Sequence, residues 1–134
     1  MITLKHKTLT VEKDEDVISV RQLARVWAVE MGFRVVDQTK ILTATSELAR
    51  NTVIAGKGGT VLLEVIDNQG KQGLRLTFED KGPGIPNVEL AMTDGYTTTG
   101  GLGLGLGGSK RLMDDFEITS EVGQGTWIRV TKWR

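Results

Sequence analysis

The chain reads Asp80-Lys81-Gly82-Pro83-Gly84 at one place and Gly101-Leu102-Gly103-Leu104-Gly105-Leu106-Gly107 shortly after it. The second stretch alternates glycine with leucine and leads into a segment with helical periodicity. Backbone N–H groups at the start of such a helix form an anion site, to which the helix dipole adds. A flexible linker is the simpler interpretation of so much glycine, but linkers rarely carry leucines in strict alternation. We therefore predict that the run from Gly100 to Gly108 binds phosphate groups.

Two better-known phosphate loops do not fit this region. Gly103-x-Gly105-x-x-Gly108 formally matches the dinucleotide fingerprint, but no strand directly precedes it and no βαβ pattern surrounds it. The Walker pattern requires Gly-Lys followed by Ser or Thr, whereas Ser109-Lys110 has the reverse order. A different class of nucleotide site is therefore indicated.

The first stretch has the properties of a site for a nucleobase. Asp80 ends a predicted strand, where its carboxylate can accept a hydrogen bond from the exocyclic amine of adenine. Gly82 and Gly84 would let the backbone approach the flat ring, which a Cβ atom would block. An ordinary turn is the competing interpretation, because all of these residues favour turns.

Glu47 and Asn51 lie one turn apart in a segment whose periodicity predicts a helix over residues 37–55. Positions i and i+4 are about 40° apart around a helix axis, so the two side chains share a face. An asparagine oxygen is a ligand that Mg²⁺ accepts, and it adds no charge beside a triphosphate. A glutamate one turn earlier could take a proton from a hydroxyl or from water. Taken alone, this spacing is also typical of a solvated helix flank.

Composition narrows the class of protein. Lysine plus arginine and aspartate plus glutamate number 17 each, whereas a nucleic-acid or anionic-membrane partner normally leaves a basic excess. With no cysteine, there is neither a disulfide framework nor a thiolate metal site. No apolar run approaches the ~20 residues of a membrane span. We expect one cytoplasmic domain over residues 1–134, with no nucleic-acid and no membrane partner.

The periodicity of the chain predicts an α+β fold. Strands are expected over residues 2–12, 60–66, 74–78, 116–121 and 126–132, and helices over 14–31, 37–55, 88–92 and 105–114. Asp37 is the predicted N-cap of the second helix. His6 is expected on the surface of a strand, and Trp27 and Trp127 in the core. This order of elements favours a mostly antiparallel sheet with helices on one face.

Four segments together resemble the boxes that define the GHKL superfamily of ATP-binding domains, which includes gyrase, Hsp90, histidine kinases and MutL. The segments are Glu47-Leu48-Ala49-Arg50-Asn51, Asp80-Lys81-Gly82-Pro83-Gly84-Ile85, Gly101-Leu102-Gly103-Leu104-Gly105 and Gly123-Gln124-Gly125-Thr126. They occur in the family order and span residues 47–126. Within the superfamily, the chain is similar to the small bacterial serine/threonine kinases of partner-switching and stressosome pathways.

That resemblance implies the Bergerat two-layer α/β sandwich, with a mostly antiparallel mixed sheet and an ATP lid over about residues 82–107. It implies Mg²⁺ and ATP as cofactors, with Asn51 as the metal ligand. Gly101, Gly103 and Gly105 would wrap the phosphates, and Leu102 and Leu104 lie between them in the same ATP-binding box. Asp80 would bind adenine with support from the Thr126 hydroxyl, and Glu47 would be the base that activates a serine of a STAS-domain protein. Members of this kind also activate a PP2C-type phosphatase once released from the STAS complex.

Other members of the superfamily remain as alternatives. An anti-sigma factor that binds a sigma factor and phosphorylates its STAS-domain antagonist carries the same boxes. A histidine kinase would need a phosphoacceptor histidine on a dimerisation helix, and His6 is the single histidine. A gyrase-like or MutL-like ATPase would need a transducer domain. A pure ATP sensor is disfavoured because Glu47 and Asn51 are both present.

Overall fold

The computed structural model describes residues 1–93 and 105–134. The strands are β1 (Ile2–Val11), β2 (Gly59–Asn68), β3 (Lys71–Asp80), β4 (Asp115–Glu121) and β5 (Gly125–Trp133). The helices are α1 (Asp14–Glu30), α2 (Val35–Ile54), α3 (Val88–Ala91) and α4 (Gly105–Leu112). The predicted order of strands and helices is therefore confirmed.

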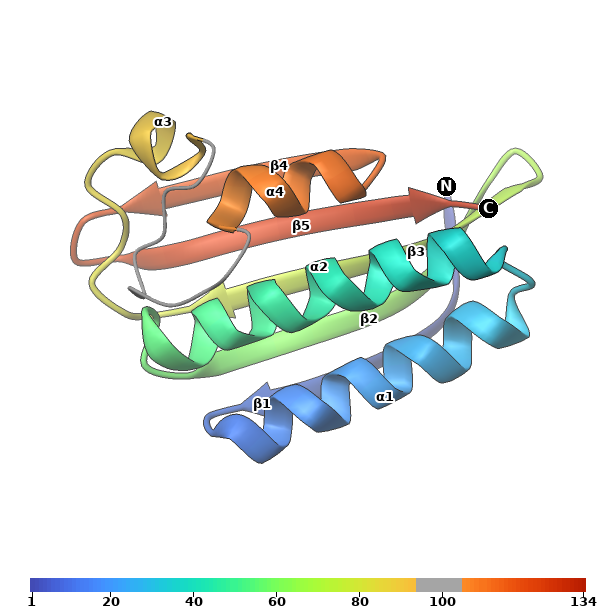
Figure 1. Ribbon diagram of the computed structural model, residues 1–134, viewed down its shortest axis with the longest axis horizontal. Coiled ribbons are helices and arrows are strands. Elements are labelled where there is room, and N and C mark those ends of the chain that lie inside the picture. Colours follow the sequence, from blue (N-terminus) through green and yellow to red (C-terminus); the bar gives the residue numbers. More distant parts are fainter. Residues whose placement is uncertain (94–104) are drawn as a thin grey trace.

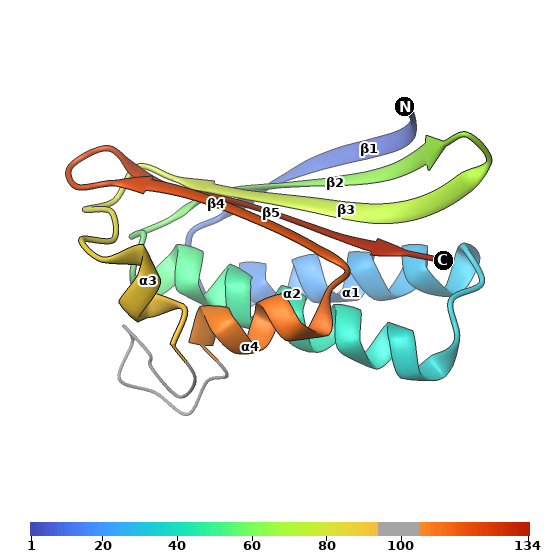
Figure 2. The same cartoon turned by 90° about the horizontal axis from the view of Figure 1, so that it is seen from above.

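The strands form one sheet in the order β1-β2-β3-β5-β4 (Figure 1), and all the pairings between them are antiparallel. The helices lie on one side of this sheet, and no described helix covers its other face (Figure 2). Helix α2 crosses the middle of the sheet, between α1 and α4. This arrangement confirms the α+β class and the two-layer architecture.

The core fills the space between the helices and the covered face of the sheet. Alternate residues of a strand point to the same face, and the central strands place aliphatic residues there at every second position. Fully or almost fully buried members are Val61, Leu63, Leu74, Leu76, Phe78, Ile128 and Val130 from the sheet, and Val20, Ala24, Trp27, Ile41, Ala44 and Leu48 from the helices. The alternation in β3 continues to Asp80, which therefore lies at the edge of this core.

Three local expectations are wrong. Helix α2 begins at Val35 with Arg34 as its N-cap, so Asp37 lies inside the first turn, where it pairs with Arg34 and Lys132. Strands β2 and β3 continue beyond their apolar cores because backbone pairing extends to Asn68 and Lys71 at the hairpin. Trp127 is half-buried on the uncovered face of the sheet, where Arg129 lies over its ring.

Candidate active site

The carboxylate of Asp80 is held in place by the backbone around it. Its Oδ1 accepts hydrogen bonds from the N–H of Gly82, at 2.9 Å, and from the N–H of Thr126, at 3.2 Å. Its Oδ2 accepts none from the residues that the structure describes. A Cβ atom added to Gly56, just after α2, would overlap this carboxyl group. Asp80 is thus an oriented acceptor with one free oxygen.

Burial raises the pKa of Asp80, and the nearby charge of Glu79 raises it further, while the two backbone N–H groups act in the opposite direction. The net pKa lies above the ordinary value for a carboxyl group. The residue is 7% exposed. A buried acceptor with one unused oxygen matches the chemistry of an exocyclic amine, which is a neutral donor.

A hydroxyl pair supports Asp80 from the β4–β5 hairpin. The hydroxyls of Ser120 and Thr126 lie 2.8 Å apart, and Ser120 Oγ also accepts a hydrogen bond from the N–H of Ile85 at 2.8 Å. The predicted residue Thr126 therefore lies beside Asp80, with both its backbone and its side chain engaged. Ser120 was missed by sequence reasoning. The antiparallel register of the folded hairpin, which places Ser120 opposite Thr126, is what brings it to the site.

The two glycines after Asp80 are needed for contacts within the protein. A Cβ on Gly82 would lie 2.7 Å from the carbonyl oxygen of Gly56. Gly84 has a φ of +78°, and a Cβ there would overlap the carbonyl oxygen of Glu121. Both residues thus allow the chain to pass close to α2 and to the β4–β5 hairpin immediately beside Asp80.

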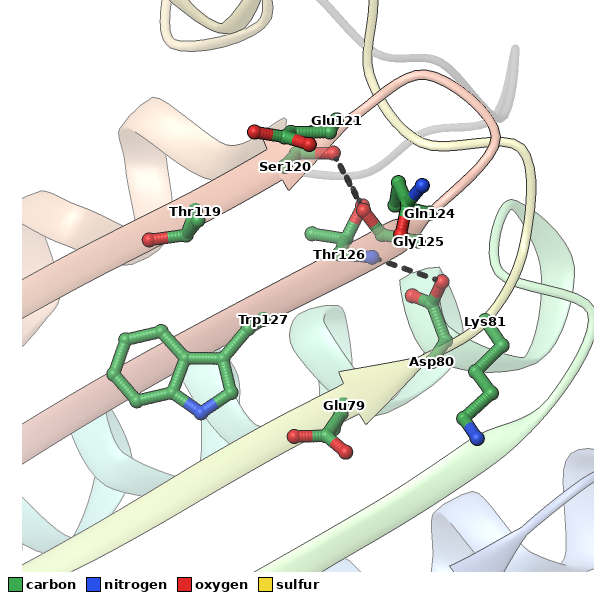
Figure 3. A pocket seen from close by; sticks show the side chains of 10 residues that line it. All are labelled: Glu79, Asp80, Lys81, Thr119, Ser120, Glu121, Gln124, Gly125, Thr126 and Trp127. Carbon is green, nitrogen blue, oxygen red and sulfur yellow. Dashed lines mark hydrogen bonds between the residues drawn. The ribbon is translucent and has the colours of Figure 1, made fainter.

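A hollow of about 290 Å³ lies at this end of the sheet (Figure 3). Its lining comes from both faces of the strands: Glu79, Asp80, Lys81, Thr119, Ser120, Glu121, Gln124, Gly125, Thr126 and Trp127. Figure 3 shows Trp127, Thr119 and Glu79 on the side of the strands away from the helices. Neither Gly56 nor Asn51 lines it. The hollow therefore opens on the uncovered face, and it shares Asp80, Ser120 and Thr126 with the site on the helix side of the sheet.

Helix α2 carries the other two predicted residues on the side that faces the sheet and α4. Asn51 is 9% exposed, and its carboxamide makes no hydrogen bond with any residue that the structure describes. Its amide atoms keep contact with solvent, because Thr45 Oγ1 is the one fully buried side-chain atom without a partner among the residues that the structure describes. An unpaired amide oxygen at the end of a helix beside the predicted base site fits a group that is a ligand for a cation.

Glu47, one turn earlier, links α2 to α4. Its Oε1 accepts a hydrogen bond from the N–H of Gly105 at 3.2 Å, and its Oε2 lies 3.6 Å from Nη1 of Arg50. The first N–H group of α4 therefore faces a carboxylate, as expected for an anion site at a helix start. The structure brings Glu47 and Gly105 together; the predicted residues Gly101, Leu102, Gly103 and Leu104 lie outside the described residues.

Within residues 1–93 and 105–134, the acidic and histidine side chains form no cluster of three that could hold a metal ion. A magnesium ion would thus depend on Asn51 and on the oxygens of a bound phosphate chain, which is the usual arrangement for Mg²⁺ with nucleotides. The residues present fit such an ion. Of the predicted lid, the structure describes residues 82–93, with α3, and the start of α4.

The profile of the histidine kinase-, DNA gyrase B- and HSP90-like ATPases matches residues 36–134. The match covers α2, the sheet from β2 onward and every predicted site residue. This chain belongs to that family of ATPases.

Curated relatives refine the class. The serine/threonine-protein kinase RsbT of Bacillus subtilis is 49% identical over 118 residues, which cover 88% of this chain and 89% of the relative. An anti-sigma F factor of Clostridium beijerinckii is 30% identical over 91% of this chain and 89% of its own length. Within the ATPase family, the chain is thus a serine/threonine protein kinase of the partner-switching type.

A solved structure agrees on the fold alone. The RsbU and RsbW domains of Rv1364c from Mycobacterium tuberculosis superimpose with a TM-score of 0.67 at 22% identity, covering 97% of this chain and 33% of that one. Among the helices that the structure describes, none is long and apolar enough to cross a bilayer.

Proposed function

We propose that this chain transfers the γ-phosphoryl group of Mg-ATP to a serine or threonine of a STAS-domain partner. The observation that carries the proposal is the convergence of three predicted residues at one end of the molecule. Asp80 offers a free, oriented oxygen, Asn51 offers an unpaired amide and Glu47 contacts the first N–H of α4. We assign Asp80 to the nucleobase, Asn51 to the cation, and the N–H of Gly105 that Glu47 contacts to the phosphates.

The chain's own residues divide the work of the reaction. Asp80 accepts a hydrogen bond from the exocyclic amine of adenine and so fixes the orientation of the nucleotide. Gly105 donates its backbone N–H to the phosphates. Glu47 accepts the proton of the partner's hydroxyl while the hydroxyl oxygen forms a bond to the γ-phosphorus. The bond between that phosphorus and the bridging oxygen breaks, and ADP leaves with the electron pair. Positioning supplies most of the rate in such transfers.

When bound through Asn51, Mg²⁺ would neutralise the negative charge of the phosphate oxygens. Because Asn51 is uncharged, the protein adds no further negative charge beside the triphosphate. A carboxylate in its place would raise the local negative charge and compete with the phosphate oxygens for the same ion.

Intact-mass analysis of a STAS-domain protein after incubation with this chain and Mg-ATP tests the proposal. We expect the mass of one phosphoryl group to be added on a serine or threonine, and to be absent when a chelator removes Mg²⁺. A partner whose mass stays unchanged, with ATP bound to this chain, would contradict the proposed substrate class.

A second candidate rests on the anti-sigma F relatives. In that case the chain would also bind a sigma factor and hold it inactive. A pull-down with purified sigma factors and with a STAS-domain protein separates the two. Capture of the STAS protein alone supports a switch kinase, and capture of a sigma factor supports the second candidate.

We further propose that the switch kinase activates a PP2C-type phosphatase once released, and that it acts in the cytoplasm within a stressosome pathway.

A further inference from the structure

The carboxylate of Glu47 is held by two groups of different kinds. Gly105 N–H donates to Oε1 at 3.2 Å from α4, and the Arg50 guanidinium approaches Oε2 to 3.6 Å from within α2. The Glu47 side chain is 13% exposed and that of Arg50 is 48% exposed. Arg50 therefore contacts one oxygen of a mostly buried carboxylate, and α4 contacts the other.

The two contacts differ in what happens to them when a nucleotide binds. The N–H of Gly105 belongs to the helix start that is expected to bind phosphate, and a triphosphate carries more negative charge than one carboxylate. Phosphate would therefore replace Glu47 at this N–H group. The Arg50 contact lies within a single helix, at positions i and i+3, and does not depend on α4. It can persist after Oε1 has been released.

We propose that Arg50 is the positioning residue of the catalytic base: it holds Oε2 of Glu47 so that Oε1, once freed from Gly105, faces the partner's hydroxyl. The inference rests on the proposed function of Glu47. A carboxylate on a flexible side chain has several rotamers, and proton transfer requires one of them. Misplacement of about 1 Å is enough to cost ~100-fold in rate.

The structure offers a matched control for this role. Arg34 and Asp37 form another i, i+3 pair at the opposite end of α2, with Nε 3.2 Å from Oδ2. The variants Arg50→Met and Arg34→Met each remove one guanidinium and keep an unbranched side chain. In each pair the guanidinium is the exposed partner, at 48% for Arg50 and 83% for Arg34, so its removal should not unfold the protein.

The first measurement compares kcat for phosphoryl transfer at saturating Mg-ATP with the Kd for Mg-ADP. We expect kcat to fall ~10- to 100-fold in Arg50→Met, with Kd unchanged within about twofold. Arg50→Lys should recover part of the rate, and Arg34→Met should match wild type. A normal kcat in Arg50→Met would overturn the inference. A parallel loss of Mg-ADP affinity would also overturn it, because Arg50 would then contact the phosphates.

The second measurement needs no turnover. In the nucleotide-free protein, the amide resonance of Gly105 reports the hydrogen bond to Glu47. We expect this resonance to shift in Arg50→Met as well as in Glu47→Gln, and to stay in place in Arg34→Met. An unchanged resonance in Arg50→Met would show that Arg50 does not hold the carboxylate. A full transfer rate in Glu47→Gln would contradict the proposed role of Glu47 as the base. A full transfer rate in Arg50→Met, with a reduced rate in Glu47→Gln, would contradict only the positioning role of Arg50.

Discussion

At the scale of a single residue, the burial of Asp80 favours binding of the nucleobase but lowers the stability of the fold. Its Oδ1 is fixed by the N–H groups of Gly82 and Thr126, which leaves Oδ2 for the nucleobase. The same burial that makes the carboxylate selective also raises its pKa. Asp80 therefore serves binding at the expense of stability, as is common for groups at functional sites.

The variant Asp80→Asn separates these two effects. The amide oxygen can keep both backbone hydrogen bonds, but the amide nitrogen would present a donor where the adenine amine needs an acceptor. We expect the affinity for ATP to fall by a factor of roughly 10 to 100, the equivalent of one charged hydrogen bond. Isothermal titration calorimetry measures this loss, and an unchanged affinity would show that Asp80 does not contact adenine.

The same variant should be more stable than wild type near neutral pH. Because the folded-state pKa of Asp80 lies above its ordinary value, the folded state binds the proton more tightly than the unfolded state. The contribution of Asp80 to stability is therefore fully present below the unfolded pKa and is lost as pH rises through the folded pKa. Urea unfolding at pH 7 and at pH 3 tests this, since the advantage of Asp80→Asn should vanish at the lower pH.

At the scale of elements, the site depends on the β4–β5 hairpin and on the chain after β3. The N–H of Gly123 donates to the carbonyl of Pro83 at 2.8 Å, and the Ile85 N–H donates to Ser120 at 2.8 Å. Gly84 lies between these two contacts. The hairpin thus fixes the direction in which the chain leaves Asp80.

Gly84→Ala tests this contact between elements. The new Cβ would meet the carbonyl of Glu121 and would hold a residue other than glycine at a φ of +78°. Gly70→Ala is the matched control, because Gly70 has a φ of +90° but nothing within 4 Å. The backbone conformation alone costs about 1–2 kcal/mol. We expect Gly84→Ala to lower the free energy of unfolding by about 1–2 kcal/mol more than the control; equal losses would contradict a tight contact.

The elements also show what a sequence can and cannot predict. The apolar periodicity located each helix and strand, because burial of one face produces that pattern. It missed the ends of β2 and β3, where polar residues such as Asn68 and Lys71 pair through the backbone alone. It also placed Trp127 in the core, because alternation identifies two faces of a strand but not which of them is covered.

For the site, residue types and spacing were sufficient to select Glu47, Asn51 and Asp80. The contact between Glu47 and Gly105 could not be predicted, because it joins two helices 58 positions apart. The role of Ser120 depends on the register of one hairpin. Pairwise contacts of this kind are properties of the folded chain, and periodicity does not contain them.

At the scale of the whole molecule, Lys132 joins three parts of the fold far from Asp80. Its ammonium group donates to the carbonyl of Leu112 at 3.0 Å and pairs with Asp114 at 3.3 Å and Asp37 at 4.0 Å. The side chain is only 9% exposed. Helix α2, the end of α4 and strand β5 are therefore connected through one buried cation.

Lys132→Met should weaken this connection without affecting the nucleotide site. Two carboxylates would lose their common partner. We expect the free energy of unfolding to fall by about 2 kcal/mol, between the values for exposed and for fully buried ion pairs. Chemical denaturation measures the loss, and the Kd for Mg-ADP should stay at the wild-type value. A reduced nucleotide affinity would mean that the two ends of the molecule are coupled.

The central claim is that Glu47 takes the proton of the partner's hydroxyl in a site where Asp80 and Asn51 hold the nucleotide. The most direct test is the single-turnover rate of phosphoryl transfer to a STAS-domain protein by Glu47→Gln at saturating Mg-ATP. We predict a rate about 10²- to 10⁴-fold below wild type, the range for loss of a general base, with nucleotide binding retained. A rate within a few fold of wild type would contradict the claim and would place the base on another residue.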